Sequence, residues 1–216
     1  MEKVGDTLAN LRRGTGTHPP AMKGTEPTRE EQLEELRKSL GVSTLDNTFD
    51  SFLPEKGTEQ ALKQFRALAG GKTTWQLLFI YGGTGNGKSH LLEALVIELY
   101  KRGLFSRVVE FSKMMSFLRG TMDKGSDLKL VEIMANWCRA PRLIIDDVGI
   151  GGSDTEWSMK MLEEIVLARH KENLFTVLST NMDISELPER VVSRFTDPEK
   201  ARMVQNRGED YRPKKA

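Results

Sequence analysis

The stretch LLFIYGGTGNGKSHLLEALVIEL, residues 77–99, decides the fold class of this chain. It opens with an apolar run of strand length, continues with a glycine-rich loop and ends in leucines at helical spacing. The loop, residues 82–89, fits the pattern G-x-x-x-x-G-K-[ST], in which a phosphate-binding loop joins a strand to a helix. We therefore predict that this stretch binds the phosphates of a nucleotide.

Each residue type of this loop has a chemical task. Glycines let the backbone wrap so that its N–H groups point at phosphate oxygens, and the following helix turns its positive end to the same anion. Lys88 is expected to place a charge on the β- and γ-phosphates, and the Ser89 hydroxyl to bind Mg²⁺. For His90, a helix side chain that faces solvent or the sheet is the alternative. The predicted cofactors are ATP and Mg²⁺, and the predicted nucleotide-binding residues are Gly82, Gly83, Thr84, Gly85, Asn86, Gly87, Lys88, Ser89 and His90.

Strand-like and helix-like segments alternate through the rest of the chain. Strands are predicted at residues 76–81, 107–111, 143–145 and 174–179. Helices are predicted at residues 89–101, 112–120, 127–138 and 156–171. This alternation is typical of parallel strands joined by crossover helices, so we expect an α/β fold with a parallel sheet.

Two carboxylates follow the apolar run at residues 143–145. Next to a phosphate loop, Asp146 is expected to hold Mg²⁺ through its water shell, and Asp147 to orient or deprotonate the attacking water. The alternative is that the two acids merely begin a loop. The sequence thus predicts Ser89 and Asp146 as metal residues and Asp147 as a catalytic residue.

Two further residues are predicted to be catalytic. Asn181 ends the fourth predicted strand, where its amide could hold the attacking water; the alternative is an ordinary turn residue. Arg194 could stabilise the charge that develops on the γ-phosphate. Such an arginine finger would come from the next subunit and would require an oligomer. Alternatively, Arg190 and Arg194 pair with acids such as Glu186 and Glu189 on a solvated face.

The amino-acid composition excludes several classes of protein. The chain has 216 residues, with 32 basic against 31 acidic side chains; 38% of the residues are apolar, or about 47% when the 19 glycines are counted with them. This is an ordinary globular value, and the near-zero balance excludes a protein that holds nucleic acid by bulk charge alone. One cysteine and three dispersed histidines make neither an internal disulfide nor a metal cluster. No apolar run is long enough for a membrane span, and residues 1–16 lack the apolar core of a signal peptide, so we expect a cytoplasmic protein.

The first 46 residues form a different region, an N-terminal arm with few apolar side chains. Thr28 and Glu31 predict a capping box, and leucines at helical spacing predict a short amphipathic helix at about residues 28–40 that Gly41 ends. The leucine stripe either packs on the body of the same chain or docks on a partner protein.

Taken together, the motifs resemble those of the AAA+ ATPases. Within them, the chain is similar to the bacterial helicase-loader family (DnaC/DnaI-like), whose ATPase core is shared with the transposition helper IstB and the initiator DnaA. The resemblance covers residues 47–212 and leaves 213–216 as a basic tail. Six segments carry it. They are the segment before the P-loop strand (47–52), Walker A (82–89), Walker B (143–149), sensor 1 (178–181), the arginine-finger box (187–195) and the tail (210–212).

The resemblance implies a P-loop AAA+ three-layer sandwich. The few residues after Phe195 are too short for the helical lid of typical AAA+ proteins, and the absence of cysteine from the arm excludes the zinc module of some loaders. The implied function is an ATP-dependent helicase loader that self-associates through a composite ATP site, binds single-stranded DNA and helps to load the replicative DNA helicase. The alternative, with the same ATPase core, is an IstB-like helper of a DNA transposase.

Two other classes remain as rivals. A small-molecule P-loop kinase would need a substrate lid and an acceptor pocket, and a binding module would use nucleotide only to switch assembly.

DNA contact is expected at one of two sets of residues. The alternatives are that the first set is an ordinary solvated face and that the second is an exposed tail without a ligand. The candidates are Lys113, Arg119 and Lys124 among Phe111, Met114, Met115 and Phe117, and the tail residues Arg202, Arg207, Arg212, Lys214 and Lys215.

Overall fold

The computed structural model describes residues 27–122, 127–149 and 155–211. Its centre is a sheet of five parallel strands in the order β2-β3-β4-β1-β5. The non-sequential order means that crossover helices connect the strands, as the alternating pattern predicts. The strands are β1 Leu77–Tyr81, β2 Val108–Glu110, β3 Arg142–Val148, β4 Phe175–Thr180 and β5 Ala201–Gln205.

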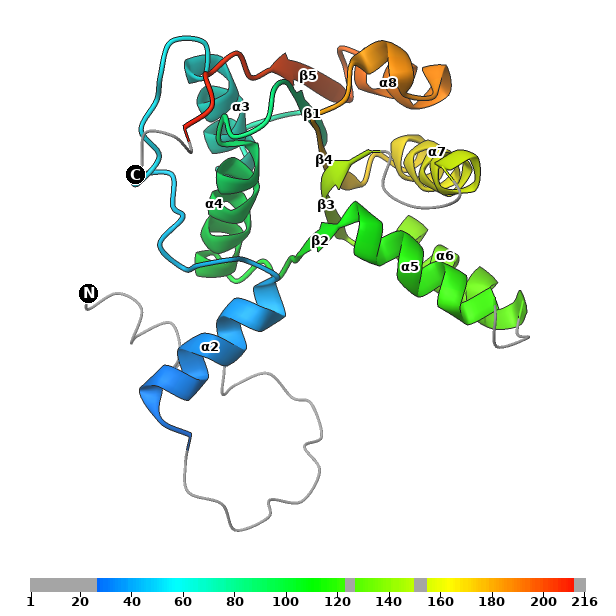
Figure 1. Ribbon diagram of the computed structural model, residues 1–216, viewed down its shortest axis with the longest axis horizontal. Helices are drawn as coiled ribbons and strands as arrows, with labels where there is room; N and C mark the ends of the chain where they lie inside the picture. The colour runs from blue at the N-terminus through cyan, green and yellow to red at the C-terminus, as the bar shows by residue number, and fades with distance from the viewer. Residues whose placement is uncertain (1–26, 123–126, 150–154, 212–216) are drawn as a thin grey trace.

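Helices cover both faces of the sheet and give three layers. Figure 1 shows α3 and α4 on one face and α5, α6, α7 and α8 on the other. The three-layer α/β fold expected from the sequence is therefore confirmed. The helices are α2 Arg29–Leu40, α3 Glu59–Ala69, α4 Lys88–Lys101, α5 Phe111–Met122, α6 Asp127–Arg139, α7 Thr155–Lys171 and α8 Glu189–Phe195.

Strand β1 divides the core into two clusters. Leu78 and Ile80 pack with α3 and α4, whereas Leu77 and Phe79 pack with the helices of the opposite face. All four side chains are fully buried because both faces of a parallel sheet are covered. This packing fixes the end of β1, from which the phosphate loop emerges.

The predicted strands and helices are all present, with ends shifted by a few residues. The predictions omitted α3, α8 and the edge strand β5. Arg202 does not belong to a tail, as its prediction assumed, because it lies in β5 beside β1, and its guanidinium lies 5.5 Å from the ring centroid of Trp75. The last tail candidates, Arg212, Lys214 and Lys215, lie outside the described residues, as do Lys124 and residues 1–26 of the arm.

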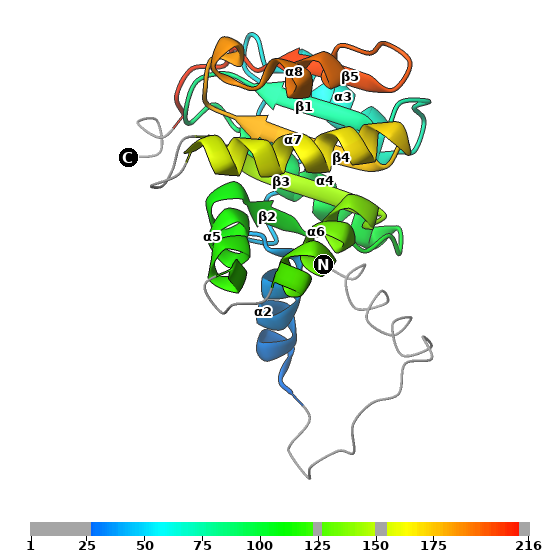
Figure 2. The ribbon, with the colours of Figure 1, turned by 90° about the vertical axis from the view of Figure 1, so that its right-hand side faces the viewer.

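Helix α2 has the ends that its sequence predicts. Thr28 caps the first turn in a capping box with Glu31, and Gly41 ends the helix with a left-handed backbone. Its last residue, Leu40, is buried in the core cluster together with Val42. The leucine stripe therefore packs on the body of the same chain at its C-terminal end, while the rest of α2 projects away from the sheet (Figure 2).

Within the described ranges, no helix has both the length and the apolar character that a bilayer span requires.

Candidate functional site

The predicted phosphate loop connects β1 to α4. Its glycines occupy backbone conformations that other residues rarely adopt, with φ of 141° at Gly82 and 90° at Gly87, the N-cap of α4. A Cβ atom at Gly87 would stand 2.8 Å from Cε2 of Phe52, so this position also needs the small residue for close packing. The loop geometry thus accounts for the glycines of the motif.

Lys88 is buried inside its own loop. Its Nζ donates hydrogen bonds to the carbonyl oxygens of Gly82 and Gly83, at 2.9 and 2.5 Å, and to Oδ1 of Asn86 at 3.1 Å. The side chain is only 6% exposed, and these loop oxygens compensate its charge. A phosphate oxygen that replaced them would give the ammonium a stronger, charged acceptor.

The two carboxylates lie at an irregularity between β3 and β4. The strand register shifts between Ile145 and Val148, and Asp147 has a φ of 55°, a left-handed conformation that Asp tolerates better than most residues. The Asp147 N–H donates to Oδ1 of Asp146 at 3.0 Å and to Oγ of Ser179 at 2.9 Å, and the Ser179 hydroxyl donates to the same Oδ1. This network holds Asp146 at the strand end.

Asn181 approaches the second carboxylate directly. Its Nδ2 donates to Oδ1 of Asp147 at 2.6 Å, and both side chains are exposed at the C-terminal ends of β3 and β4. They share one cavity of about 640 Å³ with the phosphate loop. Of the predicted site residues, this cavity brings together Gly85, Asn86, Gly87, Lys88, Ser89, His90, Asp146, Asp147 and Asn181.

The far wall of this cavity comes from residues that the motifs do not include. Gly41, Val42 and Ser43 line it, as do Glu110 and Lys113. Lys113 pairs with Glu110 at 2.6 Å, and this hydrogen bond, with one from Ser112, holds the pKa of the Glu110 carboxyl below its ordinary value. The wall therefore carries a solvent-exposed ion pair.

A second cavity of about 420 Å³ lies on the other side of the loop. It is lined by Gly85, Asn86 and Gly87, by parts of residues 46–55, which we call the 46–55 loop, and by Glu209 and Tyr211. The contribution of residues 206–211 to this cavity was not predicted, because they lie far from the loop in sequence; residues 210–212 were noted only for their resemblance to the tail of the loaders.

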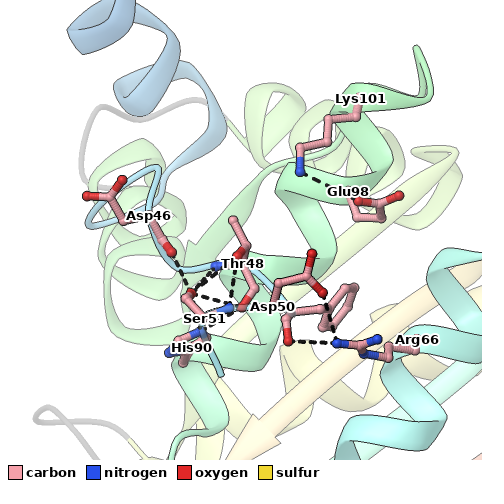
Figure 3. Close-up of polar contacts among 9 residues, drawn as sticks. Asp46, Thr48, Asp50, Ser51, Arg66, His90, Glu98 and Lys101 are labelled. Carbon is pink, nitrogen blue, oxygen red and sulfur yellow. Dashed lines mark hydrogen bonds and ion pairs between the residues drawn. The ribbon is translucent and has the colours of Figure 1, made fainter. Parts of the chain in front are cut away.

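His90 points into the 46–55 loop (Figure 3). Its Nε2 lies 2.9 Å from the carbonyl oxygen of Thr48 and 3.4 Å from Oγ of Ser51, and its ring meets the ring of Phe52 edge-on. A carbonyl only accepts, so Nε2 carries the hydrogen. The expected alternative, a side chain that faces solvent or the sheet, is therefore wrong.

Arg66 of α3 also binds the 46–55 loop. Nη2 of Arg66 donates to the Phe49 carbonyl at 2.9 Å and to Oδ1 of Asp50 at 3.1 Å (Figure 3). One wall of the second cavity is thus attached both to α3 and, through His90, to the helix that begins at the phosphate loop.

Arg194 lies apart from both cavities. It is half-buried on α8, which covers the face opposite α4, and it does not line either cavity. Arg190 pairs with Glu163 of α7 at 2.9 Å. Among the described residues, neither Glu186 nor Glu189 pairs with either arginine. The four side chains thus do not form the local pairs considered as the alternative.

The DNA candidates on α5 are partly accessible. Phe117 is 59% exposed, whereas Phe111, Met114 and Met115 are buried in the core. The guanidinium of Arg119 lies 5.3 Å from the ring centroid of Trp157. This face therefore presents cations and one exposed aromatic ring, not the full set of apolar residues that the sequence offered.

Comparison with known proteins defines the family. The model of the bacterial DnaA ATPase domain matches residues 44–198. The chromosomal replication initiator protein DnaA of Cereibacter sphaeroides is 31% identical over 154 residues, which cover 68% of this chain and 33% of the relative. That of Geotalea uraniireducens is 27% identical over 182 residues, covering 82% and 39%. The chain thus spans about a third of the length of these relatives.

Solved structures share the fold. A DnaC helicase loader superposes with a TM-score of 0.62 at 22% identity, covering 75% of this chain and 97% of the loader. A replication initiator DnaA bound to AMPPCP and single-stranded DNA superposes with a TM-score of 0.61 at 23% identity, covering 74% and 49%. Since the family model matches well over half of its residues, this chain belongs to the family of bacterial DnaA ATPase domains, with the AAA+ core.

Proposed function

We propose that this protein binds ATP–Mg²⁺ at the phosphate loop and hydrolyses it. The observation that carries the proposal is the single cavity shared by the phosphate loop and the polar ends of β3 and β4. Lys88 would bind the β- and γ-phosphates after exchanging its loop oxygens for phosphate oxygens. The loop N–H groups and the N-terminus of α4 would bind the remaining phosphate charge.

The donor set at this site suits Mg²⁺. The Ser89 hydroxyl and the Asp146 carboxylate are hard oxygen ligands, the type that Mg²⁺ prefers beside phosphates. Both hydrogen bonds to Asp146 go to Oδ1, so the carboxylate is oriented while Oδ2 stays available to the ion or to one of its waters. When bound, the ion would neutralise charge on the phosphates.

The hydrolytic step is assigned to the Asp147–Asn181 pair. Asp147 would orient or deprotonate the attacking water, and Asn181 would hold that water and the carboxylate in position. The 420 Å³ cavity beside the loop would hold the adenosine end of the nucleotide, with Phe52 and the 46–55 loop on one side and Tyr211 on the other.

Arg194 would complete the site of a neighbouring subunit. Its place on α8, away from the cavity of its own chain, supports an arginine finger offered across a subunit boundary. The proposed assembly is therefore an oligomer with composite ATP sites.

The proposed cellular role is to load the replicative DNA helicase during DNA replication. Family membership and the motif resemblance support it, and the AAA+ domain would comprise residues 47–212. Single-stranded DNA would contact Arg119, Lys113 and the exposed Phe117, which combine cations with a stacking ring. The projecting part of α2 in the arm, residues 1–46, would dock on the helicase.

Light scattering coupled to size-exclusion chromatography tests this role. The protein is mixed with the host's replicative helicase and ATP–Mg²⁺, and separately with single-stranded or duplex DNA. A defined complex with the helicase is expected. ATP-driven assembly on duplex DNA without a helicase complex would refute the loader role and favour the IstB-like transposition helper.

Two variants test the composite site in the same experiment. Arg194→Ala is expected to abolish ATP-dependent assembly and turnover. Arg190→Ala, on the same helix but paired with Glu163, is the matched control and should assemble normally. Equal behaviour of the two variants would remove Arg194 from the site.

A further inference from the structure

The segment that follows β5 returns to the phosphate loop. Asn206 is 1% exposed, and its Nδ2 donates to the Asn86 carbonyl oxygen at 2.7 Å. In return, Nδ2 of Asn86 donates to the Asn206 carbonyl oxygen, also at 2.7 Å. The Asn206 N–H donates to the Tyr81 carbonyl at the end of β1, so this residue is held to the sheet as well.

A second contact from the same segment holds the preceding loop residue. The Tyr211 N–H donates to the Gly85 carbonyl oxygen at 3.0 Å. Two consecutive carbonyl groups of the phosphate loop, those of Gly85 and Asn86, are therefore bonded to residues 206–211.

These two bonds fix the orientation of two peptide planes. In a planar trans peptide the C=O and the following N–H point in opposite directions. The carbonyls of Gly85 and Asn86 point to residues 206–211, so the N–H groups of Asn86 and Gly87 point away from that segment. Inward-pointing N–H groups of this loop are the groups that cradle nucleotide phosphates.

We propose that residues 206–211 position the phosphate loop for a polyphosphate ligand, with Asn206 as the positioning residue. Its side-chain amide acts through the Asn86 carbonyl and touches no phosphate itself. This inference rests on the proposed binding of ATP at the loop. It concerns the phosphate end of the nucleotide, although Glu209 and Tyr211 also line the cavity assigned to the adenosine end.

Calorimetric titration with Mg²⁺–ATP and with Mg²⁺–tripolyphosphate tests the proposal. Asn206→Ala is expected to weaken both ligands by the same factor, about tenfold, because both use the same N–H groups. Gln205→Ala is the matched control, since its exposed side chain bonds to Arg207 and not to the loop. It should bind both ligands as the unaltered protein does.

A second pair of variants avoids the buried position. Tyr211→Pro removes the backbone N–H that bonds to Gly85, whereas Tyr211→Ala keeps it. The proline variant should weaken tripolyphosphate several-fold relative to the alanine variant. Because this site is near the surface, the pair remains informative if Asn206→Ala does not fold.

The outcomes distinguish failure of the positioning role from failure of the proposed ATP site. Unchanged tripolyphosphate affinity in both Asn206→Ala and Tyr211→Pro would overturn the positioning role, as would a loss confined to ATP, which would place the effect at the adenosine end. If the unaltered protein bound neither ligand, the proposed ATP site would fail, and the positioning role with it.

Discussion

Asp147→Asn is the most direct test of the proposed hydrolytic site. We expect it to lower ATP turnover by about 10²- to 10⁴-fold, the usual contribution of a positioned acid or base. This equals about 3–5 kcal/mol of transition-state stabilisation. The fold should be unaffected, because the side chain is exposed and Asn tolerates the φ of 55° as well as Asp does. ATP binding should also persist, since the phosphate loop is unchanged.

The 2.6 Å contact between Asn181 and Asp147 makes the prediction quantitative for a double variant. Asn181→Ala alone should cost up to about 100-fold in turnover, the effect of misplacing a reacting group by about 1 Å. If Asn181 acts by orienting Asp147, it has nothing to orient once the carboxylate is gone. The double variant should then be no slower than Asp147→Asn alone, because residues that act as a unit are not additive.

Single-turnover ATP cleavage, with enzyme in excess of ATP–Mg²⁺ and the reaction quenched in acid, measures these rates without a contribution from product release. Asn136→Ala, an exposed asparagine on α6, serves as the matched control and should turn over normally. If the double variant lost the product of the two single losses, the two side chains would act independently and the proposed pairing would be refuted. An Asp147→Asn variant with normal turnover would remove Asp147 from the mechanism altogether.

Three other changes have defined outcomes. Arg169→Met should lower the free energy of unfolding in urea by about 3–5 kcal/mol, because the fully buried guanidinium donates to three backbone carbonyls and to a threonine hydroxyl. His90→Ala should raise the Kd for Mg²⁺–ATP several-fold by releasing the 46–55 loop, and His90→Gln, which keeps a donor for the Thr48 carbonyl, should restore binding in the same titration. The Asp197 carboxylate accepts the Glu199 N–H and a bond from His170, and both hold its pKa below the ordinary value. A lowered folded-state pKa stabilises the fold above about pH 4, and this stabilisation is lost as the pH falls through the folded-state value. Asp197→Asn should therefore lower Tm at pH 7 and converge with the unaltered protein in acid; a constant difference across the pH range would contradict this.

Elements with strong local signals were predictable from the sequence. The strand β1 and the capping box of α2 carry their patterns within a few residues. Helix α3 was missed although its buried residues, Ala61, Phe65, Leu68 and Ala69, are at helical spacing. Strand β5 carries no such pattern: only two of its five residues are buried, and its pairing with β1 defines it.

In the candidate site, too, residues within a motif were predictable and contacts between distant segments were not. The phosphate loop, the two acids near the end of β3 and Asn181 were placed in one region by their motifs, and the structure brings them to one cavity. Their chemical roles remain predictions. The bonds between Asn86 and Asn206 join residues 120 positions apart. Asn86 occupies a variable position of the loop motif and no local pattern marks Asn206, because the two become a pair only when β5 adds to the edge of the sheet.

The contacts around the phosphate loop have a common physical reason. A loop with several glycines loses more conformational entropy on ordering than an ordinary loop, so its own sequence does little to define one conformation. Here the order comes from outside the loop: Phe52 packs on Gly87, and Asn206 and Tyr211 hold two carbonyls. The glycines that allow N–H groups to reach a phosphate therefore require distant residues to hold them, and in the proposed site Asn206 does so without touching the phosphates.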